Sequence, residues 1–166
     1  MTSFTVRGGT AQTVGELPSI DTQAPQFTLV GTDLSDISLT DLAGQRIVLN
    51  IFPSVDTGVC AASVRRFNEL AAALEDTTVI CVSKDLPFAL ERFCGAEGIE
   101  RVITASAFRS SFGTDYGITQ ANGPLAGLLA RGIVVIDPRG TVLHSQINED
   151  LHTEPDYDAV LAALSD

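Results

Sequence analysis

The sequence lacks tryptophan, and it has one methionine and only three cysteines among its 166 residues. Three cysteines are too few for the dense disulfide scaffold of a small secreted protein, and an odd number cannot pair completely within one chain. A reducing cytosol keeps thiols free unless they are catalytic or redox-sensing. The question is therefore which of Cys60, Cys81 and Cys94 is reactive.

Positive charge is also scarce, because ten Lys and Arg residues face 21 Asp and Glu residues, which gives a net charge of −11. Nucleic-acid binding requires a basic footprint that can neutralise phosphates. Anionic membranes repel an acidic surface for the same electrostatic reason. We therefore predict neither nucleic acid nor membrane as a partner.

Long hydrophobic runs are absent as well. No apolar stretch approaches the roughly 18 residues of a membrane-spanning helix, and the longest stretches, in RIVLNIF and GIVVID, have the length of strands. The N-terminal segment MTSFTVRGGT lacks the basic and apolar regions of a secretory signal. The sequence therefore predicts a cytoplasmic protein.

The chain has 45% hydrophobic residues and no repeat or long linker, which predicts a single globular domain over residues 1–166. Phe4 and Val6, a turn at residues 8–9, and Thr13 and Val14 predict an N-terminal β-hairpin. The apolar run over residues 46–52 predicts a buried central strand that Pro53 ends.

The rest of the chain alternates between helical and strand patterns. A helix beginning at Asp56 or Thr57 has an apolar face of Val59, Phe67, Leu70 and Leu74. We then expect a strand over 77–83, a helix over about 86–94 with Gly95 near its C-cap, strands over 102–105, 133–137 and 142–146, and a last helix from near Pro155. This order predicts an α/β protein with a thioredoxin-like fold, in which helices flank a mixed central β-sheet and an N-terminal β-hairpin is added.

The chemistry is concentrated where the central strand runs into the first helix. Cys60 falls in the first turn, where the helix dipole and unpaired N–H groups favour a thiolate, which is the nucleophilic form. Thr57 lies one turn earlier, so its hydroxyl can face the same sulfur. Pro53 can shape the wall of the pocket because it has no N–H group and a fixed φ. Position alone leaves open that Cys60 is only a small buried hydrophobic residue.

The spacing Pro53-x-x-x-Thr57-x-x-Cys60 matches the active-site motif of the peroxiredoxin family. The surrounding segment FPSVDTGVCAASVRRFN closely resembles the thiol peroxidase branch of that family. The segments over 82–98, 106–117 and 123–137 are similar to the same branch, and the resemblance extends from TVGELP at 13–18 to the last predicted helix.

The resemblance implies a role for each residue of this motif and for two residues outside it. Cys60 matches the peroxidatic cysteine that attacks a hydroperoxide and becomes a sulfenic acid, and Thr57 matches the threonine that forms hydrogen bonds at the site. Arg131 matches the arginine that completes the site, although an exposed position at a strand edge is the commoner fate of an arginine. Cys94 matches the resolving cysteine, which implies an intrachain disulfide with Cys60. A disulfide requires the Cα atoms of its two cysteines to lie within about 7 Å of each other, so we expect local unwinding around both cysteines.

The resemblance further implies that the chain needs no metal, haem or flavin. It implies hydrogen peroxide and organic hydroperoxides as substrates, thioredoxin as the reductant, and a homodimer whose active-site edges pack together.

The remaining candidate groups favour structural interpretations. Cys81, between Ile80 and Val82, is typical of an unreactive core cysteine. The cysteines with His144 and His152 lack the spacing of a zinc site. Lys84 and Asp85 are typical of a solvated turn between a strand and a helix.

Two other functions compete with the peroxidase. A dithiol–disulfide oxidoreductase of the thioredoxin type would need a C-x-x-C motif at the start of the helix, where this chain has Thr57 in place of the first cysteine. A non-catalytic redox sensor would use the same cysteines, so the sequence separates it poorly from a peroxidase. A sensor would be oxidised once and then stop.

Overall fold

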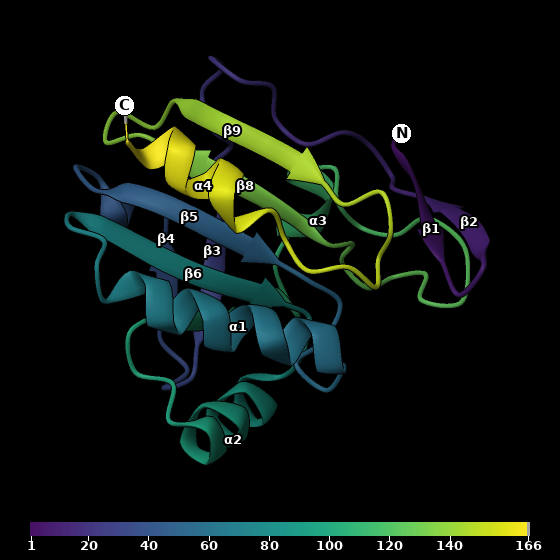
Figure 1. Cartoon of the computed structure of the whole chain (residues 1–166), viewed down its shortest axis with the longest axis horizontal. Helices are drawn as coiled ribbons and strands as arrows, with labels where there is room; N and C mark the ends of the chain where they lie inside the picture. Colours follow the sequence, from purple (N-terminus) through teal and green to yellow (C-terminus); the bar gives the residue numbers. More distant parts are fainter. Residues whose placement is uncertain (166) are drawn as a thin grey trace.

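A computed structural model describes residues 1–165 as a seven-stranded sheet with helices on both faces and a separate two-stranded hairpin (Figure 1). The strand order of the large sheet is β4-β3-β7-β6-β5-β8-β9. Strands β5, β6 and β7 are parallel to one another, whereas β8, β9, β3 and β4 are added through antiparallel pairs. The predicted α/β fold with a mixed central sheet is confirmed.

The central strand is β5 (Arg46–Ile51), which pairs with β6 (Thr77–Ser83) on one side and β8 (Gly132–Ile136) on the other. Its alternate side chains enter two separate apolar clusters, so both faces of the strand are buried. This double burial explains why its sequence is a nearly continuous hydrophobic run. Strands β7 (Ile103–Ser106) and β9 (Val142–Ile147) continue the sheet outward.

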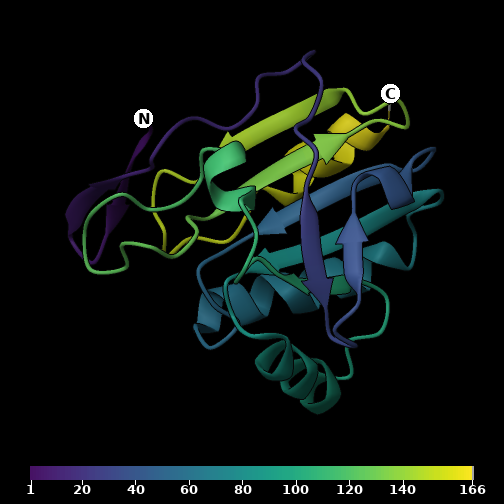
Figure 2. The same cartoon turned by 180° about the vertical axis from the view of Figure 1, so that it is seen from behind.

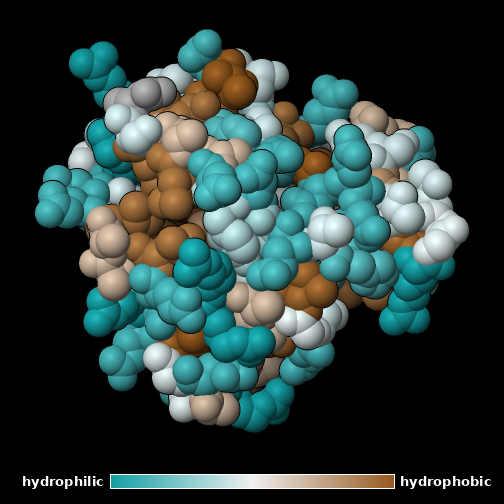
Figure 3. All heavy atoms as spheres, in the orientation of Figure 1, coloured by the Kyte–Doolittle hydropathy of each residue, from teal (hydrophilic) through white to brown (hydrophobic). Residues whose placement is uncertain are grey.

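Three helices cover one face of the sheet, namely α1 (Gly58–Ala71), α2 (Pro87–Glu97) and α4 (Tyr157–Leu164). Their apolar residues join one cluster with the facing strand residues, among them Val64, Phe67, Leu90 and Val160. Figure 3 shows that the hydrophobic atoms still visible on this face gather toward the side where α1 and α4 end. The opposite face is covered by the short helix α3 (Phe112–Asp115) and by irregular segments (Figure 2).

The N-terminal hairpin was predicted, but its turn is shifted by one residue. Strands β1 (Ser3–Val6) and β2 (Gly9–Gln12) are joined by Arg7 and Gly8. Both turn residues have positive φ, 48° and 77°, as the tight hairpin turn requires. Gly9 therefore belongs to the second strand, and the strand ends before Thr13. The hairpin lies at one end of the molecule (Figure 1).

Helix α2 extends further than predicted. Gly95 lies inside it, and the helix ends at Glu97 because Gly98 adopts the left-handed conformation, with φ 65°. The amides of Gly98 and Ile99 both donate to the carbonyl of Cys94, which satisfies this helix end. Cys94 is therefore in the body of the helix rather than at its last residue.

Four short elements were not predicted. They are β3 (Thr28–Gly31), β4 (Asp36–Ser38), the 3₁₀ turn Thr40–Leu42 and α3. Each has only three or four residues, too few for a hydrophobic period to appear. Within residues 1–165, no helix has the length and apolar character needed to cross a membrane.

Candidate active site

The candidate site lies at one edge of the sheet, where β5 and β6 end and the antiparallel strand β8 begins. Ile51, the last residue of β5, is in register with Val82 of β6 and with Gly132 of β8. The residues that follow β5, follow β6 and precede β8 are therefore neighbours. This register brings together the loop over 53–57, residue 85 and Arg131.

Cys60 is the third residue of α1, in the first turn as predicted, and it is fully buried at 0% exposure. Its sulfur accepts a hydrogen bond from Nη2 of Arg131 at 3.0 Å. A guanidinium keeps its charge, so this contact places a fixed positive charge and a hydrogen-bond donor beside the sulfur. The two residues are 71 positions apart in the sequence, and the fold brings them into contact.

Arg131 is buried, with 2% exposure, and is not an exposed residue at a strand edge. Its Nε donates to the carbonyl oxygen of Leu151 at 2.9 Å, which fixes the direction of the guanidinium. Its Nη1 is buried and has no hydrogen-bond partner among the described residues. One donor of the arginine therefore remains available beside the sulfur.

Thr57 is the N-cap residue of α1, but its hydroxyl does not bond to the sulfur in this conformation. The hydroxyl accepts from the backbone amide of Cys60 at 3.3 Å and donates to the carbonyl of Ser54 at 3.2 Å. Thr57 is exposed, whereas Pro53 is buried behind it. The structure therefore places Thr57 and Pro53 in the loop that leads directly into the cysteine helix.

Cys94 lies on α2, and its thiol is free, as is that of Cys60. Its sulfur is 3.2 Å from Oγ1 of Thr104 on strand β7. Burial raises the pKa of the Cys94 thiol, partly offset by the hydrogen bond from Thr104. In this conformation the two cysteines have different partners, and Cys94 is held as a thiol against the sheet.

Cys81 is fully buried in β6, as predicted for a core cysteine. Burial raises the pKa of its thiol to about 12, with a smaller opposing effect of the Asn50 side chain, whose Nδ2 lies 3.6 Å from the sulfur. Burial thus favours the thiol form of Cys81 and supports its structural interpretation.

Asp85 differs from the predicted solvated turn. It is half-buried, and its carboxylate accepts hydrogen bonds from the Ser54 hydroxyl at 2.7 Å, the Val55 amide at 2.9 Å and the Ser83 hydroxyl at 2.5 Å. No short-range signal could reveal two of these bonds, since they join residues 30 and 31 positions apart.

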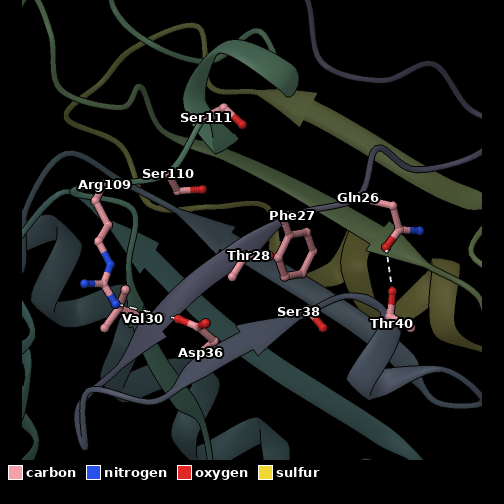
Figure 4. Close-up of a pocket in the computed structure, with 10 residues that line it drawn as sticks. All are labelled: Gln26, Phe27, Thr28, Val30, Asp36, Ser38, Thr40, Arg109, Ser110 and Ser111. Carbon is pink, nitrogen blue, oxygen red and sulfur yellow. Dashed lines mark hydrogen bonds and ion pairs between the residues drawn. The ribbon is translucent and has the colours of Figure 1, made fainter.

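A cavity of about 630 Å³ lies away from this site, between β3, β4 and residues 109–111. Figure 4 shows the Arg109 side chain pointing toward Asp36 in its lining, and the two form an ion pair at 3.7 Å. In residues 1–165 no three His, Cys, Asp or Glu side chains are grouped so that they could hold a metal ion.

A buried cysteine in the first turn of a helix, with an arginine donating to its sulfur, on a thioredoxin-like sheet, defines a thiol-redox protein. Comparison with known proteins agrees with this class. Residues 20–161 match the Redoxin family model. The chain is 58% identical to the thiol peroxidase of Corynebacterium glutamicum over 96% of both chains, and 58% identical to that of Mycobacterium tuberculosis over 99% of both chains.

Solved structures give the same result. A peroxiredoxin-like protein from Aquifex aeolicus superposes with a TM-score of 0.92 at 34% identity, covering 98% of this chain and 95% of the other. Thiol peroxidase from Chromobacterium violaceum has a TM-score of 0.91, covers 98% of this chain and 95% of its own, and at 20% identity supports the fold alone. The chain belongs to the Redoxin family, in the thiol peroxidase branch of the peroxiredoxins.

Proposed function

We propose that this protein is a thiol-dependent peroxidase that reduces hydrogen peroxide and organic hydroperoxides with Cys60. The observation that carries the proposal is the 3.0 Å contact between the Arg131 guanidinium and the sulfur of Cys60. A buried cysteine that served only as a hydrophobic residue would not need a buried charged donor, since desolvating an arginine is costly. Thiol peroxidases at 58% identity over nearly the whole chain support the same function.

In the first step, the Cys60 thiolate attacks the terminal oxygen of the hydroperoxide. The S–O bond forms as the O–O bond breaks, which gives a Cys60 sulfenic acid and an alkoxide or hydroxide that takes up a proton. The unpartnered Nη1 of Arg131 can donate to a peroxide oxygen and stabilise the leaving charge. Cys60 has no exposed surface, so its neighbours must move before an oxygen atom can reach the sulfur.

In the second step, Cys94 resolves the sulfenic acid. Its thiol condenses with the Cys60 sulfenic acid to form an intrachain disulfide and release one water molecule. Cys94 must first leave Thr104, and its thiolate is disfavoured by burial. Both facts support local unwinding of α2, together with the first turn of α1, as part of the reaction cycle.

The disulfide must then be reduced by a dithiol, and we propose thioredoxin in this role. We also propose a reducing compartment such as the cytoplasm, because the cycle depends on free thiols. We further propose a homodimer in which active-site edges pack together. Three exposed apolar side chains near Asp85 support this proposal. Leu86 and Phe88 follow Asp85 closely in the chain. Phe108 is linked to Asp85 through the Ser106 hydroxyl, which donates to the carbonyl of Asp85 and accepts from the amide of Phe108.

Steady-state kinetics with thioredoxin and thioredoxin reductase test the function. The protein should consume many equivalents of peroxide for each chain. A series of alkyl and lipid hydroperoxides should define its substrates, and a comparison of thioredoxin with glutaredoxin should define its electron donor. Consumption of a single equivalent followed by a stop would instead identify a redox sensor.

A further inference from the structure

Asp85 connects the two segments that carry the proposed reactive cysteines. It lies in the connection between β6 and α2, two residues before Pro87 begins the helix that contains Cys94. Its carboxylate accepts from Ser54 and Val55, which belong to the loop that leads into the helix containing Cys60. We refer to Asp85, Ser54 and Val55 and their two hydrogen bonds as the Asp85 clamp.

The clamp continues as hydrogen bonds to the amide of Cys60 itself. The hydroxyl of Ser54 donates to Asp85 and accepts from the amide of Asp56. The backbone carbonyl of Ser54 accepts from the hydroxyl of Thr57. That hydroxyl in turn accepts from the amide of Cys60. Asp85 therefore fixes the loop that sets the start of the cysteine helix.

The other side of the clamp is fixed to the sheet. The Ser83 hydroxyl donates to the same carboxylate, and the Ser106 hydroxyl on β7 donates to the carbonyl of Asp85 at 2.6 Å. The carboxylate accepts three hydrogen bonds in a half-buried position, and such charge-assisted bonds are stronger than neutral ones. The loop before α1 thus cannot move freely relative to the start of α2.

We infer that Asp85 is a positioning residue that controls the exchange between the peroxide-reducing conformation and the unwound conformation that forms the disulfide. This inference rests on the proposed function. While the clamp is formed, it holds the 53–57 loop and the start of α1 in place, which keeps Cys60 beside Arg131 for the attack that follows once other neighbours have moved to admit peroxide. When it breaks, the segments carrying Cys60 and Cys94 are free to unwind and approach each other.

The inference predicts that two steps change in opposite directions in Asp85→Ala. Oxidation of Cys60 by the first equivalent of peroxide should slow about tenfold, because its loop is misplaced. Formation of the Cys60–Cys94 disulfide should accelerate about tenfold, since charge-assisted hydrogen bonds no longer oppose unwinding. The fraction of sulfinic acid formed under excess peroxide should therefore fall.

Ser54→Ala should give the same pattern more weakly. The double variant, Asp85→Ala with Ser54→Ala, should change each rate by less than the product of the single effects, because both residues form one clamp.

Asp137→Ala is the matched control. Asp137 is also a half-buried carboxylate in a turn, and it accepts the amides of Arg139 and Thr141, remote in sequence from both cysteine segments. It should leave the ratio of the two rates unchanged.

Amide exchange in the reduced protein tests the connection without peroxide. In Asp85→Ala, and more weakly in Ser54→Ala, exchange should become faster over both 54–60 and 87–97, a result that the Asp137→Ala control should not give. Unchanged or slower disulfide formation in both clamp variants, or faster exchange over 54–60 alone, would overturn the inference. Failure of the wild-type protein to reduce peroxide would instead overturn the proposed function, and the exchange measurement would still decide whether Asp85 couples the two segments.

Discussion

At the scale of single residues, the central feature is a buried sulfur that accepts from a buried guanidinium. Arg131 is oriented by the carbonyl of Leu151 and reaches Cys60 with one nitrogen, while another has no partner within residues 1–165. Arg131→Ala removes the fixed positive charge and the donor for the peroxide oxygen. We expect peroxide reduction slower by on the order of 10²-fold.

Stopped-flow oxidation of the two proteins by one equivalent of peroxide measures this effect. Arg131→Lys is a useful control, because it keeps the charge but cannot form the forked contact to both Leu151 and Cys60. Equal oxidation rates in wild type and Arg131→Ala would show that the contact has no part in the chemistry.

Alkylation of the Cys81 and Cys94 thiols should depend differently on pH. Because burial raises the pKa of Cys81 to about 12 and also raises that of Cys94, their thiolates form only above the pH at which an ordinary cysteine ionises. At pH 7 to 8, alkylation of the folded protein should therefore be slow at Cys94 and slowest at Cys81. Mass spectrometry of iodoacetamide-treated protein over a pH series checks the order, and rapid labelling of Cys81 near pH 8 would contradict it.

Cys81→Ser should also test the structural assignment of this cysteine. The new hydroxyl is buried beside Asn50, and loss of stability should be about 1–3 kcal/mol if it finds no adequate partner. Turnover by the folded variant should stay close to that of the wild type. A large loss of turnover without unfolding would mean that Cys81, rather than Cys94, resolves the sulfenic acid.

At the scale of elements, the N-terminal hairpin supports the site indirectly. The backbone of Thr5 makes two hydrogen bonds to the 149–151 segment. The carbonyl of Thr5 accepts from the amide of Leu151, and the amide of Thr5 donates to the carbonyl of Glu149. The carbonyl of Leu151 in turn accepts from Arg131. Deletion of the hairpin, residues 1–12, should therefore release the 149–151 segment and slow the oxidation of Cys60 by peroxide.

The deletion is compared with Arg131→Ala by the same stopped-flow oxidation. The hairpin deletion should give a change in the same direction but smaller, and combining the two should add little to the effect of Arg131→Ala alone. Fully additive effects would indicate that the hairpin acts only through general stability.

The elements that the sequence predicted are those with a strong local pattern. Strands β5 and β6 are long and buried on both faces, so their runs of Ile, Val and Leu identify them without further information. Strand β3 depends on long-range pairing, such as Val30 with Ser106, that no local pattern contains. Strand β4 and helix α3 have only three and four residues, too few for a hydrophobic period to appear. The position of Cys60 in the first turn of a helix followed from helix capping. The contact with Arg131 was indicated only by family resemblance. The proposed role of Asp85 depends on contacts that the chain makes only after folding.

At the scale of the whole molecule, the cycle requires a change between two conformations. In the structure Cys60 contacts Arg131 and Cys94 contacts Thr104, and we predict that formation of the proposed disulfide breaks both contacts. One equivalent of peroxide should yield a Cys60–Cys94 bond within a single chain, seen as a monomer on non-reducing gels and as a cross-link in peptide maps. Oxidation should also reduce amide-exchange protection over 88–98.

Cys94→Ser separates the two steps. It should consume the first equivalent of peroxide rapidly and then stop as a sulfenic acid, which excess peroxide converts to sulfinic acid. A Cys60–Cys60 bond between chains, or a Cys60–Cys81 bond in the wild-type protein, would contradict the intrachain mechanism while leaving Cys60 as the nucleophile.

The most direct test of the central claim is single-turnover oxidation of Cys60→Ser in parallel with Cys94→Ser, with one equivalent of peroxide and no reductant. A serine hydroxyl supplies almost no anion at neutral pH, so Cys60→Ser should consume no peroxide on the timescale on which Cys94→Ser consumes a full equivalent. Consumption of peroxide by well-folded Cys60→Ser at a rate close to that of the wild type would contradict the account, because it would place the nucleophile on another residue.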